Sequence, residues 1–233
     1  MAFSDDLNRS VAPVWRACIA HPFLEGIVSS TLTPAQFGFY LYQDAYFLAE
    51  DARVMAIAAS RATTLRQVAD LARLIENVNQ AEQTRHRAFA AELGVVLEDP
   101  AEARPAPTAL AYVNHLRSVA LDGSLGELLA ALLPCPWLYR DFGRHYVDRA
   151  PDNPMYRDWL APYAGDEFDQ RVRQQIALVD ALAEQVSEAE RARMKRHFVI
   201  STRYEHLFFD MAFAMEAWPD FASAADEDVM ARA

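Results

Sequence analysis

Apolar residues recur along most of the chain at intervals of three or four positions, the spacing of one face of an α-helix. We find no alternating run rich in Val, Ile and Thr between turn residues, the pattern typical of a β-strand. The sequence therefore predicts an all-α fold. The expected helices cover 4–19, 34–60, 64–92, 108–121, 125–149 with a break, 154–161, 166–186 and 188–217.

Four of these helices begin with a capping box, in which a Ser or Thr is followed three residues later by Glu or Gln. The boxes begin at Thr33, Thr64, Ser124 and Ser187. Gly94 is placed to end a helix, because glycine tolerates the left-handed backbone conformation found there. No shift in composition marks a domain boundary. We expect one helical domain over 1–217 and an acidic C-terminal tail over 218–233.

The charge balance limits the partners of the protein. Its 22 Lys and Arg residues against 33 Asp and Glu residues give a net charge of -11, which repels phosphate backbones and anionic lipids. No apolar run approaches the 18 or so residues that cross a bilayer, and the amino-terminal segment has no apolar signal stretch. We expect a cytoplasmic protein that binds neither nucleic acid nor membrane.

Two carboxylates interrupt apolar helix faces. Asp44 lies within an apolar stripe of the expected helix 34–60, and Glu205 lies within one of the helix 188–217. A buried carboxylate needs a partner or a shifted pKa, and functional pockets collect such groups. Either acid alone fits a structural salt bridge, but two such acids together favour a functional site.

Cys135 stands between Pro134 and Pro136. Each proline removes a backbone N–H donor, so the helix that begins near 125 must kink or break there, and a ligand can reach a thiol at such a break. A cysteine outside a disulfide is usually a small buried hydrophobe, which is what we expect of Cys18.

Aromatic side chains accompany the acids and the thiol. Phe47 and Phe208 lie within one helical turn of Asp44 and Glu205 respectively, while Tyr112, Tyr139 and Tyr163 supply hydroxyl groups nearby. Such rings are commonly part of a core. Combined with two carboxylates, an aromatic slot also suits a flat, nitrogen-bearing ring whose amidine-like edge pairs with a carboxylate.

Four segments in order resemble the TenA family, also called thiaminase II: 37–50, 132–139, 163–168 and 201–213, with the sequences FGFYLYQDAYFLAE, LLPCPWLY, YAGDEF and STRYEHLFFDMAF. The resemblance extends over about 20–217. It implies a haem-oxygenase-like helical bundle that uses neither haem nor any other cofactor or metal, and a homotetrameric assembly.

Similarity to the cysteine-containing branch of this family implies an aminopyrimidine aminohydrolase of thiamin salvage. Such an enzyme converts 4-amino-5-aminomethyl-2-methylpyrimidine to 4-amino-5-hydroxymethyl-2-methylpyrimidine and ammonia, with cleavage of thiamin as a side activity. Which of the two substrates this chain prefers stays open.

The resemblance also assigns roles to residues of this chain. Asp44 matches the carboxylate that grips the aminopyrimidine edge, Cys135 the nucleophile and Glu205 the acid that transfers protons. The remaining substrate-binding positions are Phe47, Tyr112, Tyr139, Tyr163 and Phe208. Phe47 stands where the family often has tyrosine, and Ala164 and Asp166 alter the usual Tyr-Gly-Gly-Glu-Glu-Phe phrase, which bears on substrate preference.

Two alternatives stay open. The spacing Glu82-x-x-x-His86 and Asp141-x-x-x-His145 puts an acid and an imidazole on one helix face, which allows a metal-dependent oxidase on the same scaffold. No histidine has Glu three positions before it, so the di-iron motif of ferritin-like bundles is absent from the sequence. The second alternative is a regulator that binds a pyrimidine without catalysis.

Overall fold

The computed structural model describes residues 2–77, 83–97, 99, 102–149 and 151–219. Every regular element among them is a helix, which confirms the predicted all-α fold. The elements are α1 (Phe3–Ile19), α2 (Pro22–Val28), α3 (Pro34–Ser60), α4 (Leu65–Asn77), α5 (Gln83–Glu92), α6 (Pro107–Asp122), α7 (Leu125–Leu132), α8 (Pro134–Tyr146), α9 (Pro154–Leu160), the 3₁₀ turn η2 (Ala161–Ala164), α10 (Asp166–Ala183) and α11 (Glu188–Ala214).

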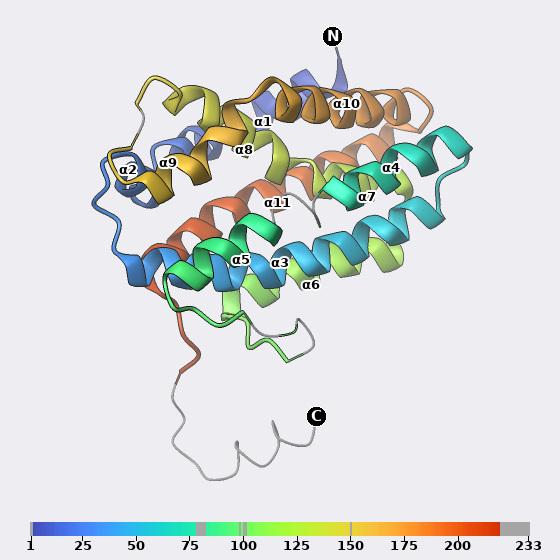
Figure 1. The fold of residues 1–233 in the computed structure, drawn as a ribbon. Coiled ribbons are helices and arrows are strands. Elements are labelled where there is room, and N and C mark those ends of the chain that lie inside the picture. The colour runs from blue at the N-terminus through green and yellow to red at the C-terminus, as the bar shows by residue number, and fades with distance from the viewer. Residues whose placement is uncertain (1, 78–82, 98, 100–101, 150, 220–233) are drawn as a thin grey trace.

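The two longest helices, α3 and α11, have 27 residues each and run side by side in opposite directions through the molecule (Figure 1). Asp44 comes ten residues after α3 begins at Pro34, and Glu205 comes nine residues before α11 ends at Ala214. Because the helices are antiparallel, both carboxylates lie at the same level of the bundle. The apolar stripes that contain them are buried as predicted.

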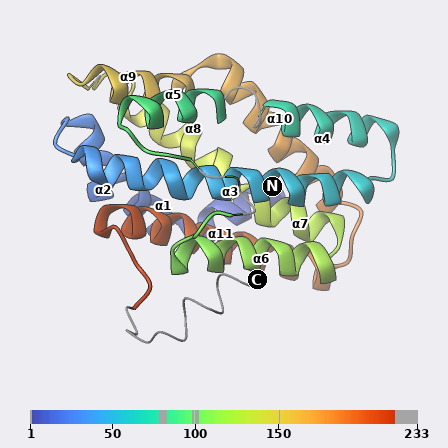
Figure 2. The ribbon, with the colours of Figure 1, turned by 60° about the horizontal axis from the view of Figure 1, so that its bottom comes forward.

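The other helices pack around this pair (Figure 2). The α3 helix contacts α4, α5 and α6, while α11 contacts α1, α6, α7 and α8. The α8 helix packs closely on η2. Gly143 makes this approach possible, since a Cβ atom there would lie 2.7 Å from the Cβ of Tyr163. This contact holds Tyr163 against α8, where Cys135 lies.

Most predicted helix boundaries are confirmed within a few residues. The predicted helix 64–92 is present as α4 and α5, on either side of residues 78–82, which lie outside the described part. The predicted break in 125–149 falls at Leu133, between α7 and α8. The short helix α2 was not predicted, because its seven residues include Gly26 and it is capped by a histidine side chain.

The predicted caps are present at all four positions. The side chains of Thr33, Thr64, Ser124 and Ser187 each accept a hydrogen bond from the backbone N–H three residues on. Gly94 has the left-handed φ of 70° expected of a residue that ends a helix. These local interactions fix where the elements that support the site begin and end.

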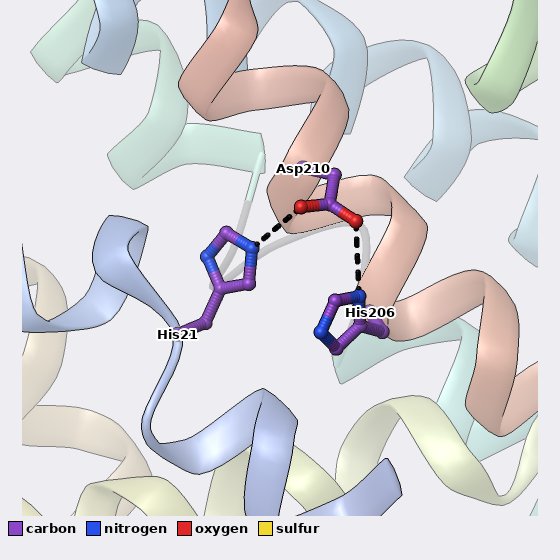
Figure 3. A group of neighbouring side chains, drawn as sticks. All are labelled: His21, His206 and Asp210. Atoms are coloured by element: carbon purple, nitrogen blue, oxygen red, sulfur yellow. Dashed lines mark hydrogen bonds and ion pairs between the residues drawn. The ribbon is translucent and has the colours of Figure 1, made fainter.

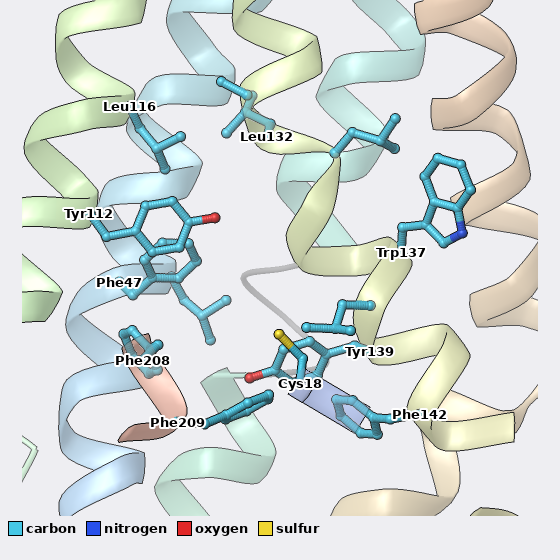
Figure 4. Packing of buried hydrophobic residues seen from close by; sticks show 14 of the residues in the cluster. Cys18, Phe47, Tyr112, Leu116, Leu132, Trp137, Tyr139, Phe142, Phe208 and Phe209 are labelled. Atoms are coloured by element: carbon cyan, nitrogen blue, oxygen red, sulfur yellow. The ribbon is translucent and has the colours of Figure 1, made fainter. Parts of the chain in front are cut away.

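A hydrophobic core dense in aromatic rings lies between these helices (Figure 4). No helix of the described residues is long and apolar enough to cross a membrane. Just after the end of α11, the indole N–H of Trp218 donates a hydrogen bond to the carbonyl oxygen of Pro105, which precedes α6. The predicted acidic tail falls mostly on 220–233, which lie outside the described residues.

Candidate active site

A cavity lies between α3, α4, α8, η2 and α10, and it contains about 620 Å³ of space including its opening to solvent. Most of its lining is apolar, and a few polar groups converge on it, which is typical of a small-molecule site. Its lining residues are Asp44, Leu48, Asp51, Met55, Leu74, Cys135, Pro136, Tyr139, Tyr163, Phe168, Arg171, Val172 and Gln175. Four of the sequence-predicted site residues therefore share one cavity: Asp44, Cys135, Tyr139 and Tyr163.

Cys135 reaches the cavity because of the helix break. The α7 helix ends at Leu132 and α8 starts at Pro134, a favourable first residue because its missing N–H would have no helical acceptor. This start places the half-buried Cys135 in the first turn of α8, on the cavity wall. Cys18 is fully buried in the core, and burial raises the pKa of its thiol, so the prediction that Cys18 is a buried hydrophobe is confirmed.

Asp44 is buried on the α3 wall, with 6% of its surface exposed. Its Oδ2 lies 3.2 Å from Nδ1 of His86, which α5 supplies. Burial of the His86 ring and, to a smaller extent, the charge of Arg85 lower its pKa to about 3. The imidazole is therefore neutral at physiological pH, and its contact with Asp44 is not an ion pair.

Glu205 lies behind the cavity wall and is 4% exposed. Its Oε1 accepts a hydrogen bond of 2.7 Å from the Tyr112 hydroxyl. Burial raises the pKa of Glu205 to about 7, although the hydrogen bond from Tyr112 acts in the opposite direction. A carboxyl group with this pKa can both donate and accept a proton near neutral pH.

The tyrosines connect these groups. Burial raises the pKa of Tyr139, and the nearby charges of Asp44, Cys135 and Glu205 raise it further. These three groups thus lie within electrostatic reach of one phenol. The Tyr139 hydroxyl also shares a 2.8 Å hydrogen bond with the Tyr40 hydroxyl, which fixes its position.

The remaining predicted rings pack against one another in tilted and edge-on pairs. The Phe47 ring centre lies 4.9 Å from that of Tyr112 and 5.8 Å from that of Phe208. In Figure 4 Tyr112 and Tyr139 project from opposite sides of the core, with the Tyr112 hydroxyl on the right of its ring and the Tyr139 hydroxyl on the left of its ring. Phe47, Tyr112 and Phe208 are close to the cavity but are not among its lining residues.

Several groups of the site were not predicted. His86 was considered only as a metal ligand, and the sequence analysis gave Tyr40, Asp51 and Arg171 no role in the site. Asp51 could have been found from the sequence, because it follows Asp44 by seven residues and so lies on the same helix face. The contacts of His86 and Tyr40 join different helices, and periodicity within one helix does not reveal them.

Two of the four residues proposed for a metal-dependent oxidase, His86 and Asp141, make other contacts. His86 is buried against Asp44, while Glu82 lies outside the described residues. The two carboxylate oxygens of Asp141 accept hydrogen bonds from Arg140 and from the Trp15 indole. These contacts do not favour the oxidase.

Another cluster contains His21, His206 and Asp210, whose potential ligand atoms lie within 4.8 Å of one another (Figure 3). His21 caps α2, because its Nδ1 accepts a hydrogen bond from the Phe23 N–H. In the neutral ring the proton must then be on Nε2, which donates to Asp210 at 3.0 Å. Both nitrogens of His21 are thus used in joining α2 to α11, which gives the cluster a structural role.

Comparison with known proteins agrees with this fold. The model of the TENA/THI-4/PQQC family matches residues 8–215. The chain belongs to this family. The predicted resemblance is thereby confirmed over nearly the whole sequence.

Two curated relatives are similar over nearly their whole length. The chain is 39% identical to the aminopyrimidine aminohydrolase of Bacillus subtilis (strain 168) over 222 residues, which are 95% of this chain and 94% of the relative. It is 34% identical to the aminopyrimidine aminohydrolase of Halalkalibacterium halodurans over 220 residues, covering 94% of this chain and 98% of the relative.

Solved structures of TenA proteins share the fold. The TenA homologue protein from P. horikoshii OT3 superposes with a TM-score of 0.84 at 27% identity. The superposition covers 92% of this chain and 99% of that chain. The helical TenA fold implied by the resemblance is therefore confirmed.

Proposed function

We propose that this protein is an aminopyrimidine aminohydrolase that replaces the amine of a 5-aminomethylpyrimidine with a hydroxyl group and releases ammonia. The observation that supports this most is the shared cavity, which brings Asp44 and Cys135 together with Glu205 close behind. Curated relatives that are similar over nearly their whole length are named for this activity.

Asp44 recognises the substrate in this proposal. Its carboxylate accepts hydrogen bonds from the exocyclic amine and a protonated ring nitrogen, a paired contact that is strong in a largely apolar cavity. The rings of Tyr139, Tyr163 and Phe168 on the cavity wall suit the faces of a flat heterocycle.

Cys135 is the nucleophile. Water displaces an amine from a methylene group slowly, but addition of the Cys135 thiolate to the pyrimidine makes the ring electron-rich. The ring then expels ammonia, and the electron pair of the broken C–N bond stays on nitrogen. Water adds to the exocyclic methylene, and the thiolate leaves as the ring recovers its aromaticity.

Glu205 moves the protons. With a pKa of about 7 it is partly protonated at neutral pH, so it can give a proton to an amine that arrives unprotonated. The resulting carboxylate accepts a proton from the attacking water, which returns Glu205 to its acid form. Thiamin, whose leaving group is a thiazole ring, is a second substrate in the same reaction scheme.

The test compares the wild-type protein with Glu205→Gln. We expect the wild type to form the hydroxymethylpyrimidine and ammonia in equal amounts, and the variant to keep its affinity for the pyrimidine while kcat falls at least a hundredfold. Absence of ammonia release by the wild type would contradict the proposed function. A variant impaired only in binding would contradict the role of Glu205.

Comparing kcat/KM for the aminomethylpyrimidine and for thiamin determines which is preferred, and we expect the aminomethylpyrimidine. The homotetrameric assembly and the cytoplasmic location remain predictions. The assembly is checked by light scattering at micromolar concentration.

A further inference from the structure

A second buried acid, Asp51, lines the same cavity and has no role in the mechanism above. It is 6% exposed, as is Asp44. Their separation of seven residues is nearly two turns of α3, so the two acids start from one helix face at positions about 10 Å apart along its axis. That length is comparable to a pyrimidine ring with its side arm.

Asp51 lies toward the opposite side of the reaction centre from Asp44. Burial raises the pKa of Tyr112, and the charges of Glu205, Cys135 and Asp51 raise it further. The corresponding charges at Tyr139 are Asp44, Cys135 and Glu205. Cys135 and Glu205 are thus shared by both phenols, with Asp44 near Tyr139 and Asp51 near Tyr112.

The amine of the substrate and the hydroxyl that replaces it in the product differ in charge. An amine on a methylene group is largely protonated at neutral pH, whereas the hydroxyl that replaces it is neutral. The two groups have similar size and occupy the same position on the ring. A carboxylate near this position therefore distinguishes substrate from product by charge rather than by shape.

On the basis of the proposed function, we infer that Asp51 is a specificity-determining residue that binds the cationic leaving amine while Asp44 holds the opposite edge of the ring. The ammonium form is the one in which the C–N bond breaks to give neutral ammonia. Asp51 thus favours the reactive form of the amine, and its attraction ends when the neutral alcohol has formed, which aids product release.

The basic residue Arg171 also lines the cavity, and a cation near the leaving amine would oppose this role. Its guanidinium carbon lies 5.1 Å from the centre of the Phe168 ring, which in turn lies 5.2 Å from the Tyr163 ring. Arg171 is therefore on the Tyr163 side, whereas Asp51 acts on Tyr112.

The neighbouring residue Glu50 provides a matched control. It is a buried acid on the same helix, but its carboxylate pairs with Arg117 and Arg53 and is not part of the cavity lining. Replacing Glu50 by Gln removes one negative charge close to Asp51 without altering the cavity wall. It thereby separates a direct contact from a general change of the electrostatic field.

The experiment measures KM for the aminomethylpyrimidine and the inhibition constant of the hydroxymethylpyrimidine, with folding checked by thermal melting. We expect Asp51→Asn to raise KM about tenfold, as for the loss of one charge-assisted contact, and to change the inhibition constant less than twofold. Glu50→Gln and the charge-preserving Asp51→Glu should change the ratio of the two constants less than threefold. If Asp51→Asn does not fold, Asp51→Ser provides the same comparison.

Equal weakening of both ligands in Asp51→Asn would overturn the inference, since it would show that Asp51 only shapes the cavity. An unchanged KM would overturn it as well, as would the same change of ratio in Glu50→Gln. Failure of the proposed function is a separate result, because it appears as absence of ammonia release by the wild-type protein.

Discussion

Replacing Tyr112 by Phe removes a single oxygen atom and tests the proton-transfer role of Glu205. The Tyr112 hydroxyl donates a 2.7 Å hydrogen bond to Glu205, and this bond stabilises the charged carboxylate. The variant keeps the ring that packs against Phe47. Its main effect on Glu205 is therefore to make ionisation less favourable.

The size of the effect follows from the hydrogen bond. A hydrogen bond to a charged group contributes about 1.5–3 kcal/mol, and one pKa unit corresponds to about 1.36 kcal/mol. Without Tyr112 the pKa of Glu205 should therefore increase by about one to two units above its present value of about 7.

The pH dependence of kcat for ammonia release measures this shift. Because an amine that arrives as ammonium leaves without a further proton, Glu205 must be ionised to accept a proton from the attacking water, so kcat of the wild type should fall as the pH decreases below about 7. In Tyr112→Phe the same decline should begin one to two units higher. Tyr156→Phe is the control, because the Tyr156 hydroxyl donates to the Leu32 carbonyl oxygen away from the cavity. A decline that does not move, or that moves to lower pH, would refute the reasoning.

Three further predictions concern thiol reactivity and stability. An alkylating reagent should label Cys135 in the native protein and spare Cys18, which is fully buried; mass spectrometry that finds both labelled at equal rates would contradict this. The pKa of His86 is about 6.5 in the unfolded chain and about 3 in the folded chain, so the free energy of unfolding should decrease as the pH falls, by about 2 kcal/mol between pH 7 and 5. In denaturant titrations, His86→Gln should remove this part of the pH dependence. Tyr40→Phe should lower the free energy of unfolding by about 1–2 kcal/mol, because Tyr139 loses a buried hydrogen-bond partner, and an unchanged melting temperature would count against it.

Much of the fold could be predicted because its determinants are local. The capping boxes and the proline-induced break depend on residues within one helical turn, and they place the helix starts and Cys135 where the structure has them. The stripes that contain Asp44 and Glu205 correctly predict burial, because helical periodicity alone determines which side of a helix faces the core.

The parts that could not be predicted depend on contacts between distant segments. The approach of His86 to Asp44 and the Tyr40–Tyr139 hydrogen bond are set by how α3 packs against α5 and α8. Spacing within one helix contains no information on that packing. The direction of the pKa shift of Glu205 followed from its burial, whereas its hydrogen bond to Tyr112 needed the position of α6.

The central claim is that Cys135 performs the covalent step on a pyrimidine held in the cavity, and the Cys135→Ser variant tests it most directly. Calorimetric titration should show that Cys135→Ser and the wild type bind the hydroxymethylpyrimidine product with affinities within threefold of each other, while ammonia release by the variant falls at least a thousandfold. Cys18→Ser, which changes the other thiol, should retain activity in its folded fraction. Near-normal ammonia release by Cys135→Ser would contradict the account.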